Sequence, residues 1–277
     1  IIANVVRDME DDLNLVECFC QGGRCIIKPV CELKSALTQA LTAYLERLAW
    51  HCHFIQKLED EPRIEFENMN RAFDGLRETE FNDEYFAAWQ EGRTGYPMVD
   101  ACMRALIATG WINFRMRAML ISFAVYHLWL HWREPALHLA RSFVDYEPGI
   151  HYSQVQMRAG TDGISTLRIY SPIKQAKDQD PQGHFIRRWV PELASVPAEF
   201  VAEPHRRPPE MQEAAGCRIG REYPMPIVDH LQAYRAAKQR MYAARKTARI
   251  SGESDRVFQR HGSRRRQGMR ARARTRA

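Results

Sequence analysis

Apolar residues repeat every three or four positions through much of the chain, and this spacing limits its possible folds more than any other feature. The clearest run starts at about residue 33 and comprises Leu33, Leu37, Leu41, Tyr44, Leu45 and Leu48. It predicts an amphipathic helix that continues through Phe54 and ends in a loop near Pro62. Helix-forming residues are plentiful and runs of Val and Ile are scarce. The sequence therefore predicts an all-α fold.

Glycine and proline residues divide the following segment into further helices. Pro97 is placed to begin a helix, Met98 to Thr109 reads as its body, and Gly110 is a typical C-terminal cap. The stretch from Trp111 to Trp132 reads as a second, more apolar helix. Its most apolar part, residues 118–130, is too short to span a bilayer, so we expect it to be buried in the domain centre.

The remaining segments are expected to alternate between helix and loop. A helix should restart at Glu134 and run towards Phe143, and residues 184–193 and 227–246 also read as helical. Residues 145–185 are rich in Gly, Pro and Asp and read mainly as loops, which are common places for functional sites. The predicted organisation is a divergent or poorly ordered lead-in (1–32), a helical domain (33–246) and an Arg-rich disordered tail (247–277).

The positive charge of the chain is concentrated in its tail. Residues 256–277 contain nine arginines and no acidic residue, whereas the whole chain carries +6, so the remainder carries −3. Bulk charge therefore gives no reason to expect that the folded part binds nucleic acid. The tail could bind DNA non-specifically through counterion release, or it could simply be a solvated segment.

Cysteine usage points to a reducing compartment. The seven cysteines are scattered and odd in number, which does not indicate a disulfide framework.

The first residues lack the pattern of a signal peptide, so we expect a cytoplasmic protein with no membrane association. The missing initiator Met suggests a fragment. Four cysteines gather near the start, but their spacing is not a common zinc pattern, and no metal is expected. They are Cys18, Cys20, Cys25 and Cys31.

Three motifs are more specific than composition. They are residues 92–104 (GRTGYPMVDACMR), residues 109–117 (TGWINFRMR), and residues 168–173 (RIYSPI) followed by residues 185–193 (FIRRWVPEL). In this order and spacing, the chain resembles the FAD-binding domain of the DNA photolyase/cryptochrome family from about residue 40 to about residue 245. The resemblance implies an all-α, photolyase-like helical domain with FAD in its centre. The family's N-terminal α/β antenna domain has no counterpart here, nor has its diphosphate-binding loop, and a separate chain could supply the missing half.

The resemblance also implies a range of functions. Photolyases use light absorbed by reduced flavin to donate an electron to a pyrimidine dimer that is flipped out of DNA, and so repair it. Cryptochromes use the same cofactor for signalling. We therefore expect a photolyase-like flavoprotein, and by resemblance a lyase that acts on DNA. The alternatives are a cryptochrome-like flavin- or DNA-binding protein without lyase activity, and a truncated remnant.

One group of cofactor residues is expected around the second motif. Arg117 and Asp145 match the family's Arg–Asp pair beside the isoalloxazine, and Glu147 stands where the family has a second acidic residue. A buried arginine is tolerated only when paired, and a carboxylate is its best partner. The pair could instead be a structural salt bridge between helices. Trp111 and Tyr146 are assigned to the same cofactor site.

Phe114 departs from the family pattern. It shares a helix face with Asn113 and Arg117, and it matches the position whose side chain faces flavin N5. Photolyases commonly carry Asn there, whereas Phe can neither donate nor accept a hydrogen bond. Alternatively, a shift of one residue would give this role to Asn113.

The helix from Tyr44 to Phe54 is expected to line the other wall of the site. Trp50 matches an aromatic residue that packs against the flipped dimer. His51 stands where an Arg usually meets the flavin phosphates, and Arg47 where a Glu contacts the lesion. Tyr44 is assigned to the cofactor as well. In the simpler alternative, Trp50 and His53 are residues of the core and its rim.

The family's relay of three tryptophans is incomplete in this chain. Trp132 matches the middle tryptophan, but Val155 stands at the flavin-proximal position and Thr79 at the surface position. We therefore expect slow photoreduction by this route, unless Trp89, Trp129 or Tyr152 substitutes. A further expected dimer-stacking tryptophan is replaced by Met157, which weakens the case for repair.

Overall fold

The computed structural model describes the backbone of residues 20–21, 24–25, 28–246 and 248–262, and the side chains of residues 37–246 and 252–262. These residues divide into two compact units, 1–56 and 57–277. The first holds a pair of two-residue antiparallel strands, β1 (Cys20–Gln21) and β2 (Arg24–Cys25), and most of the long helix α2 (Lys28–Asp60). The helix predicted from residue 33 is thus present, and it starts five residues earlier. The rest of the predicted lead-in lies largely outside the described residues.

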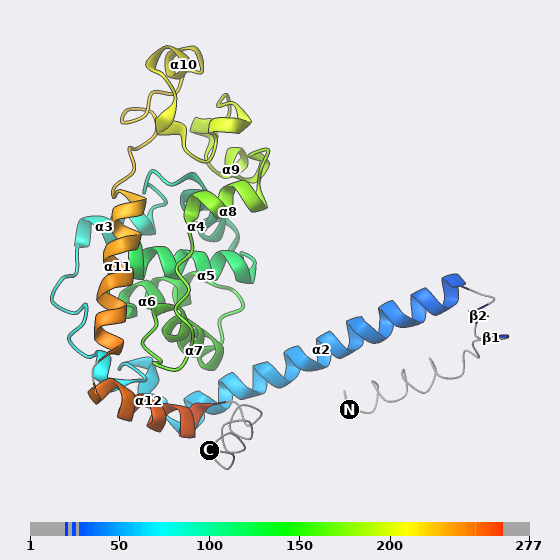
Figure 1. The fold of residues 1–277 in the computed structure, drawn as a ribbon. Coiled ribbons are helices and arrows are strands. Elements are labelled where there is room, and N and C mark those ends of the chain that lie inside the picture. The colour runs from blue at the N-terminus through cyan, green and yellow to red at the C-terminus, as the bar shows by residue number, and fades with distance from the viewer. Residues whose placement is uncertain (1–19, 22–23, 26–27, 247, 263–277) are drawn as a thin grey trace. The chain divides into compact units, whose positions relative to one another are not determined.

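The second unit is built from helices and short helical turns, which confirms the predicted all-α fold (Figure 1). The α-helices are α3 (Asp83–Gln90), α4 (Pro97–Thr109), α5 (Phe114–Ser122), α6 (Arg133–Ser142), α7 (Pro148–Ala159), α8 (Pro172–Gln179), α9 (His184–Trp189), α10 (Pro209–Ala214), α11 (His230–Arg245) and α12 (Ala248–His261). The turns are η1 (Pro62–Glu65), η2 (Arg71–Phe73), η3 (Phe123–His127), η4 (Pro191–Leu193), η5 (Ala198–Phe200) and η6 (Pro204–Arg206). No helix in the described part of the chain is both long and apolar enough to cross a bilayer.

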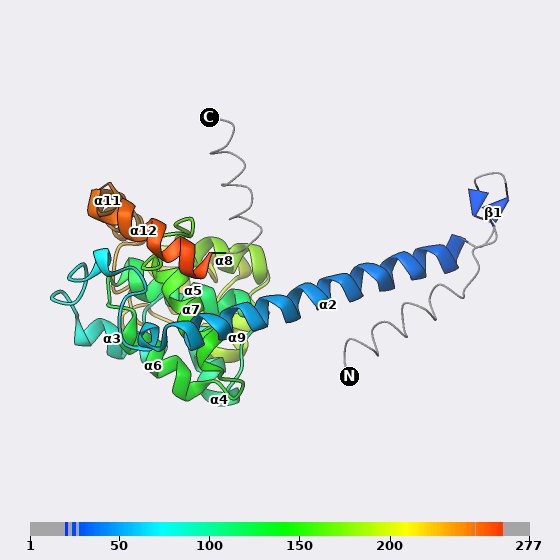
Figure 2. The same ribbon diagram turned by 90° about the horizontal axis from the view of Figure 1, so that it is seen from below.

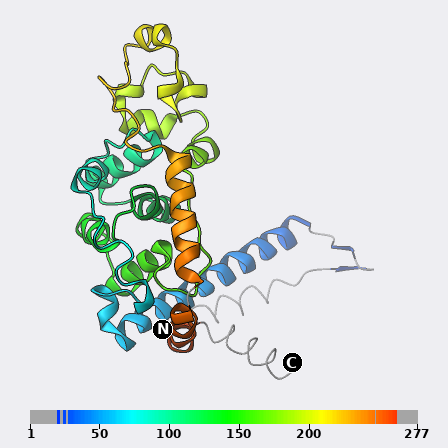
Figure 3. The same ribbon diagram turned by 60° about the vertical axis from the view of Figure 1, so that its left-hand side comes forward.

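One hydrophobic core joins most of these helices. It runs through α4, α5 and η3 and includes the fully buried Met103, Leu106, Leu120 and Phe123. α11 packs against η3, and Figure 3 shows the orange helix α11 running along the helices of the second unit. Its buried residues there are Ala237 and Met241, which join the same core. Burial of apolar surface is the main driving force for such packing.

The predicted helix from Trp111 to Trp132 is shorter than expected. The α-helix α5 ends at Ser122, and η3 continues it as a π-helical turn before the chain leaves the helix. Trp129 then adopts a positive φ of 53°, which no α-helix contains and which is uncommon for a residue with a side chain. The guanidinium groups of Arg77 and Arg240 lie 4.5 and 4.7 Å from the centroid of its ring. Cation–π packing therefore accompanies the bend that ends the helix.

The segment 145–185 contains more helix than its composition predicts. α7 and α8 both lie within it, each starting with a proline at its first position. Side chains cap both N-termini: Glu147 accepts hydrogen bonds from the backbone of Gly149 and Ile150, and Ser171 accepts one from Lys174. The Gly and Pro residues that suggested loops thus mark the ends of helices.

The first motif forms a turn that is tied to the rest of the fold. Asp100, in the first turn of α4, is completely buried. Its carboxylate accepts hydrogen bonds from the Thr94 amide at 2.8 Å, the Thr94 hydroxyl at 2.6 Å, the Gly95 amide at 3.1 Å and the Tyr223 hydroxyl. Gly95 has φ +78°, and a Cβ there would lie 2.4 Å from the backbone of Met225. The turn therefore requires both glycine at 95 and the carboxylate at 100.

The predicted disordered tail contains a packed helix. α12 turns away from the axis of α11, as Figure 2 shows from below. Val257 packs with Ile64 and Met69 in a small separate cluster. In addition, the buried His261 contacts the buried Glu61. The expectation of disorder for residues 247–277 therefore does not hold for α12, because tertiary contacts outweigh its polar composition. Residues 263–277 lie outside the described residues.

A stacked histidine pair connects the core to the start of α11. The rings of His127 and His230 lie 5.3 Å apart, and His127 Nε2 is 3.1 Å from His230 Nδ1. Burial, with a smaller contribution from His230, lowers the pKa of His127 to about 3, and burial also lowers that of His230. Both rings are therefore neutral in the folded chain near neutral pH.

We expect this pair to make the fold sensitive to mild acid. An unfolded histidine has a pKa of about 6.5, so below that pH the unfolded chain binds protons that the folded chain does not. The free energy of unfolding should then fall, by up to about 1.4 kcal/mol per pH unit for one such group. Urea unfolding at pH 7, 6 and 5 should show a smaller loss in His127→Phe than in the wild type. His184→Phe, at an exposed position, should keep the wild-type slope; equal slopes in all three would contradict the assignment.

Candidate functional site

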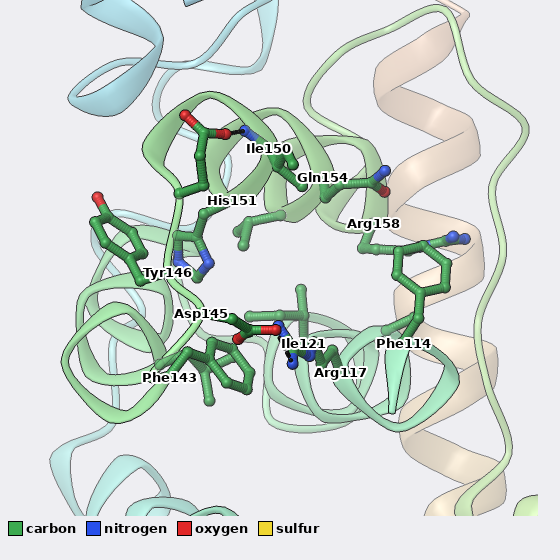
Figure 4. Close-up of a pocket in the computed structure, with 14 residues that line it drawn as sticks. Phe114, Arg117, Ile121, Phe143, Asp145, Tyr146, Ile150, His151, Gln154 and Arg158 are labelled. Carbon is green, nitrogen blue, oxygen red and sulfur yellow. Dashed lines mark hydrogen bonds and ion pairs between the residues drawn. The ribbon is translucent and has the colours of Figure 1, made fainter. Parts of the chain in front are cut away.

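A cavity of about 190 Å³ lies between α5 and α7 and is closed at one end by residues 143–147 (Figure 4). The exposed surface of its walls is largely apolar, although several charged and polar side chains also line it. The lining residues are Phe114, Arg117, Ala118, Ile121, Leu139, Phe143, Asp145, Tyr146, Glu147, Ile150, His151, Gln154, Val155 and Arg158. Five residues of the predicted cofactor site thus meet in one place: Phe114, Arg117, Asp145, Tyr146 and Glu147. Their roles remain predictions.

Arg117 and Asp145 form a bidentate ion pair at the cavity edge. Nη1 donates to Oδ1 at 3.0 Å and Nη2 donates to Oδ2 at 2.9 Å. The Nε of Arg117 donates to the Ile112 carbonyl at 2.8 Å, and the guanidinium lies 4.1 Å from the centre of the Phe143 ring. These contacts fix the orientation of the guanidinium plane. The pair is partly exposed, 24% for Arg117 and 48% for Asp145, so its contribution to stability alone should be small.

Glu147 has a structural task in addition to its place at the cavity. Its two carboxylate oxygens accept hydrogen bonds from Gly149 N at 3.1 Å and Ile150 N at 2.7 Å. It therefore caps the N-terminus of α7, where a negative charge is favourable. The predicted second acidic residue thus also positions the helix that forms one wall.

Phe114 and Arg158 lie together at the opposite end of the cavity (Figure 4). The Arg158 guanidinium is 5.7 Å from the centre of the Phe114 ring and 5.9 Å from that of Tyr170. Among the described residues, Arg158 Nε and the nearby Gln154 Oε1 have no hydrogen-bond partner. Phe114 is 55% exposed. Gln154 and Arg158 were not predicted as site residues, since α7 was not expected there.

His151 is a further cavity residue that the sequence did not indicate. Its Nε2 donates a hydrogen bond to the carbonyl oxygen of Ala136 at 2.9 Å. Burial is the main reason that its pKa is lowered to about 4, and the nearby Arg117 lowers it as well. His151 lies in a segment that was predicted to be mainly loop, so the sequence did not mark it as a site residue. The structure places it on α7, in the wall of the cavity.

Trp111 and Asn113 line a different groove. This groove, about 340 Å³, also contains Phe185 and Trp189. The Oδ1 atom of Asn113 accepts a hydrogen bond from Met116 N at 3.1 Å and so caps α5. Asn113 and Phe114 thus line different pockets. Of the two, only Phe114 lines the cavity between α5 and α7.

The four predicted residues of α2 belong to the first unit of the chain. Tyr44, Arg47, Trp50 and His51 are all exposed in the structure of that unit. The Trp50 ring stacks on that of Phe54 with centroids 5.8 Å apart. Their assignment to the cofactor and the substrate remains a prediction.

The predicted relay residue Trp132 is completely buried. Its Nε1 donates to Asn68 Oδ1 at 2.7 Å. Val155 lines the cavity itself. Val155 therefore lines the cavity at a position where the resemblance predicts a tryptophan.

The cavity suits the ring system of a flavin. Such a ring needs apolar walls and a few polar groups at its edges, and the cavity supplies both. Two of its polar atoms, Arg158 Nε and Gln154 Oε1, are buried without a protein partner, as expected where a ligand contributes to the site. Its volume is below the range of about 300–1,000 Å³ for whole small-molecule sites, so it matches a ring system rather than an entire dinucleotide.

Metal ligation has less support. Within the described residues, no group of three or more His, Cys, Asp and Glu side chains could hold a metal ion. Cys18, Cys20, Cys25 and Cys31 lie outside the residues whose side chains are described.

Comparisons with known proteins identify the family. A sequence model of the FAD-binding domain of DNA photolyase matches residues 44–243. A deoxyribodipyrimidine photo-lyase of Alkalihalophilus pseudofirmus is 34% identical over 68% of this chain and 39% of its own length. A cryptochrome-1 of Culex quinquefasciatus is 30% identical over 75% of this chain and 42% of its own. The crystal structure of a class III photolyase from Agrobacterium tumefaciens superposes with a TM-score of 0.69 and 32% identity, over 75% of this chain and 43% of that one.

The chain spans less than half the length of these relatives. The matched region nevertheless contains both walls of the cavity and all three sequence motifs. FAD is the cofactor for which the matching domain is named. The chain therefore belongs to the photolyase/cryptochrome family, as a member with its FAD-binding domain.

Proposed function

We propose that this chain holds FAD with its flavin ring in the cavity between α5 and α7, as the cofactor-binding part of a photolyase-like protein. The observation that carries the proposal is the cavity itself, which has largely apolar walls and an oriented Arg117–Asp145 pair at its edge. Arg117 would present a fixed cationic edge to the flavin, while Ile121, Phe143 and Ile150 would contact its faces. Bound FAD would supply light-driven one-electron transfer.

Repair of pyrimidine dimers in DNA is the activity that the named relatives suggest first. Several relatives of this chain are deoxyribodipyrimidine photo-lyases. In such a reaction, Trp50 would stack on the flipped substrate and Trp132 would take part in electron transfer. The exposed Phe114 and the unpaired Arg158 at the cavity mouth could meet a base and a phosphate.

A cryptochrome-like function without repair is the second candidate. Its support is Val155, which lines the cavity at the expected place of the proximal tryptophan and cannot pass electrons to Trp132. Met157 and Arg47 also replace residues that the resemblance associates with the dimer. Cryptochromes are among the similar proteins.

The first experiment is to measure FAD bound by the purified full chain. We expect a visible flavin absorption spectrum and near-stoichiometric FAD released on denaturation, or saturable uptake of added FAD. A colourless chain that takes up no FAD would contradict the proposal and favour a remnant. For the flavin-bound chain, light-dependent splitting of dimers in DNA above a dark control would support repair. Its absence would favour the second candidate.

A further inference from the structure

The C-terminal helix α12 lies beyond residue 243, where the match to the family model ends. It is nevertheless held against the first residues of the second unit at several points. The Ser254 hydroxyl accepts a hydrogen bond from Asn70 Nδ2 at 3.0 Å, and Val257 packs with Ile64 and Met69 in a small apolar cluster. The helix therefore has a docking surface of its own, which the resemblance to the family does not explain.

The last residue of α12 is a buried histidine that meets a buried carboxylate. The side chains of His261 and Glu61 are 0% and 2% exposed, and His261 Nε2 contacts Glu61 Oε2. A carboxylate accepts hydrogen bonds, so this Nε2 carries a hydrogen. The other ring nitrogen, Nδ1, is buried and has no hydrogen-bond partner in the described part of the chain. Protonation of the ring would place a second N–H there with nothing to accept it, which is unfavourable.

The charges around His261 act in the same direction. Burial is the main reason that its pKa is lowered, and Lys57 and Arg260 lower it further, whereas Glu61 raises it. The Glu61 carboxylate is shared with two other cations, because Arg63 and Arg260 also pair with it. The docked helix thus holds a neutral His261, whereas a histidine in a released, solvated helix would have a pKa of about 6.5.

The residues that α12 covers are attached to the cavity helix α7. Gln156 is fully buried, and its Nε2 donates to the carbonyl oxygens of Ile64 at 2.7 Å and Glu67 at 2.8 Å. Its Oε1 accepts a hydrogen bond from the Met69 amide at 2.6 Å. The preceding residue, Val155, lines the cavity. Release of α12 would uncover Ile64 and Met69 and so weaken the support behind one cavity wall.

We infer that α12 is an acid-released clasp, which opens when His261 is protonated and whose docking and FAD binding strengthen each other. The coupling to FAD rests on the proposed function. The released helix binds a proton more readily than the docked one, so docking is strongest above about pH 6.5 and weakens as the pH falls below it. For one proton, the docking equilibrium falls by up to about tenfold per pH unit. A free glutamic acid titrates near pH 4.3, so the range down to pH 5.5 reports on His261.

Hydrogen exchange of the full-length chain at pH 7.5 and 5.5 tests the release, with each rate corrected for intrinsic exchange. Protection of the α12 amides should fall by up to about tenfold in the wild type. His261→Gln can still donate to Glu61 but is not protonated in this range, so its α12 should keep its protection. Wild-type protection that does not change, or that falls equally in His261→Gln, would overturn the clasp.

The matched control for this acid response is His127→Phe, which removes the buried histidine of the core pair. Its α12 amides should lose protection as those of the wild type do, because His261 is still present. A response of α12 that disappears in His127→Phe would show that acid acts through the core, and would overturn the assignment to His261.

FAD titration of the full-length chain at pH 7.5 tests the coupling. Val257→Asp places a charge in the apolar contact, so it should release α12 and weaken FAD binding about fivefold or more. Ala236→Asp adds the same charge at an exposed position of α11 and should bind FAD as the wild type does. Protection of the α4 amides in the same samples checks that the core of each variant is folded.

Coupling between two sites is reciprocal, so saturating FAD should also raise the protection of α12 in the wild type. Unchanged FAD affinity in a Val257→Asp chain whose α12 is released would overturn the coupling. A wild type that binds no FAD would overturn the proposed function and the coupling with it. The exchange data at the two pH values would still decide whether α12 is released by acid.

Discussion

Replacing Asp100 with alanine is expected to destabilise the fold by about 3–5 kcal/mol, a large fraction of the stability of a typical domain. The reason is that one fully buried carboxylate is the acceptor for four donors, from Thr94, Gly95 and Tyr223. Removing it leaves these donors buried and unpaired, which costs far more than the net value of each hydrogen bond. Urea unfolding followed by circular dichroism would measure the change.

Two variants define the size of this effect. Tyr223→Phe removes only one of the four donors and should cost clearly less than Asp100→Ala. Asp178→Ala removes a carboxylate whose partner, Lys174, is exposed, and should change the free energy of unfolding by less than about 1 kcal/mol. A loss below about 1 kcal/mol in Asp100→Ala would show that the turn at 92–96 does not depend on the carboxylate.

Arg117→Met should weaken FAD binding by about 10- to 100-fold with little change in stability. The substitution removes the cationic edge of the cavity and releases the Asp145 carboxylate, whose negative charge would then face the ligand. Because the ion pair is partly exposed, its loss should cost the fold only about 1 kcal/mol or less. Titration with FAD and thermal unfolding of the same samples would separate the two effects.

The control for this prediction is Arg93→Met, which removes an arginine whose ion pair with Glu91 is exposed and outside the cavity. It should leave FAD affinity unchanged. The double variant Arg117→Met/Asp145→Asn should bind FAD better than Arg117→Met alone, because the unpaired carboxylate is gone. Wild-type affinity in Arg117→Met would mean that the pair is only a structural salt bridge between α5 and the loop after α6.

The sequence predicts the helices whose ends carry strong local signals. α4 begins at Pro97 and ends at Thr109, and the φ of 72° at Gly110 confirms the predicted cap. The prediction of one long helix to Trp132 was wrong in its C-terminal part. The reason is that apolar residues continue past Ser122, where the α-helical geometry ends. Periodicity alone does not distinguish an α-helix from a π-turn followed by buried loop.

The sequence predicted the site residues that match the family's pattern, but it did not predict those that lie on α7. Arg117 and Asp145 could be paired in advance through the family resemblance, and the structure brings them together. His151, Gln154 and Arg158 were not selected, because the proline and glycine at 148–149 were read as loop rather than as a helix start. These three residues are one or two helical turns apart, so they share a face only if the segment is a helix. Without that knowledge, their spacing in the sequence does not indicate a common site.

The π-helical turn η3 has a consequence for which insertions and deletions this chain can accept during evolution. A π-turn holds one more residue than the α-helical turn it replaces, so it absorbs an insertion without moving the helix before it. Deleting one residue from 123–127 would let this segment return to α-helical geometry while the residues after it keep their positions relative to α5. Trp132, which follows the turn, would then keep its hydrogen bond to Asn68. The turn is thus a place where the chain can lose one residue without loss of the contacts that follow it.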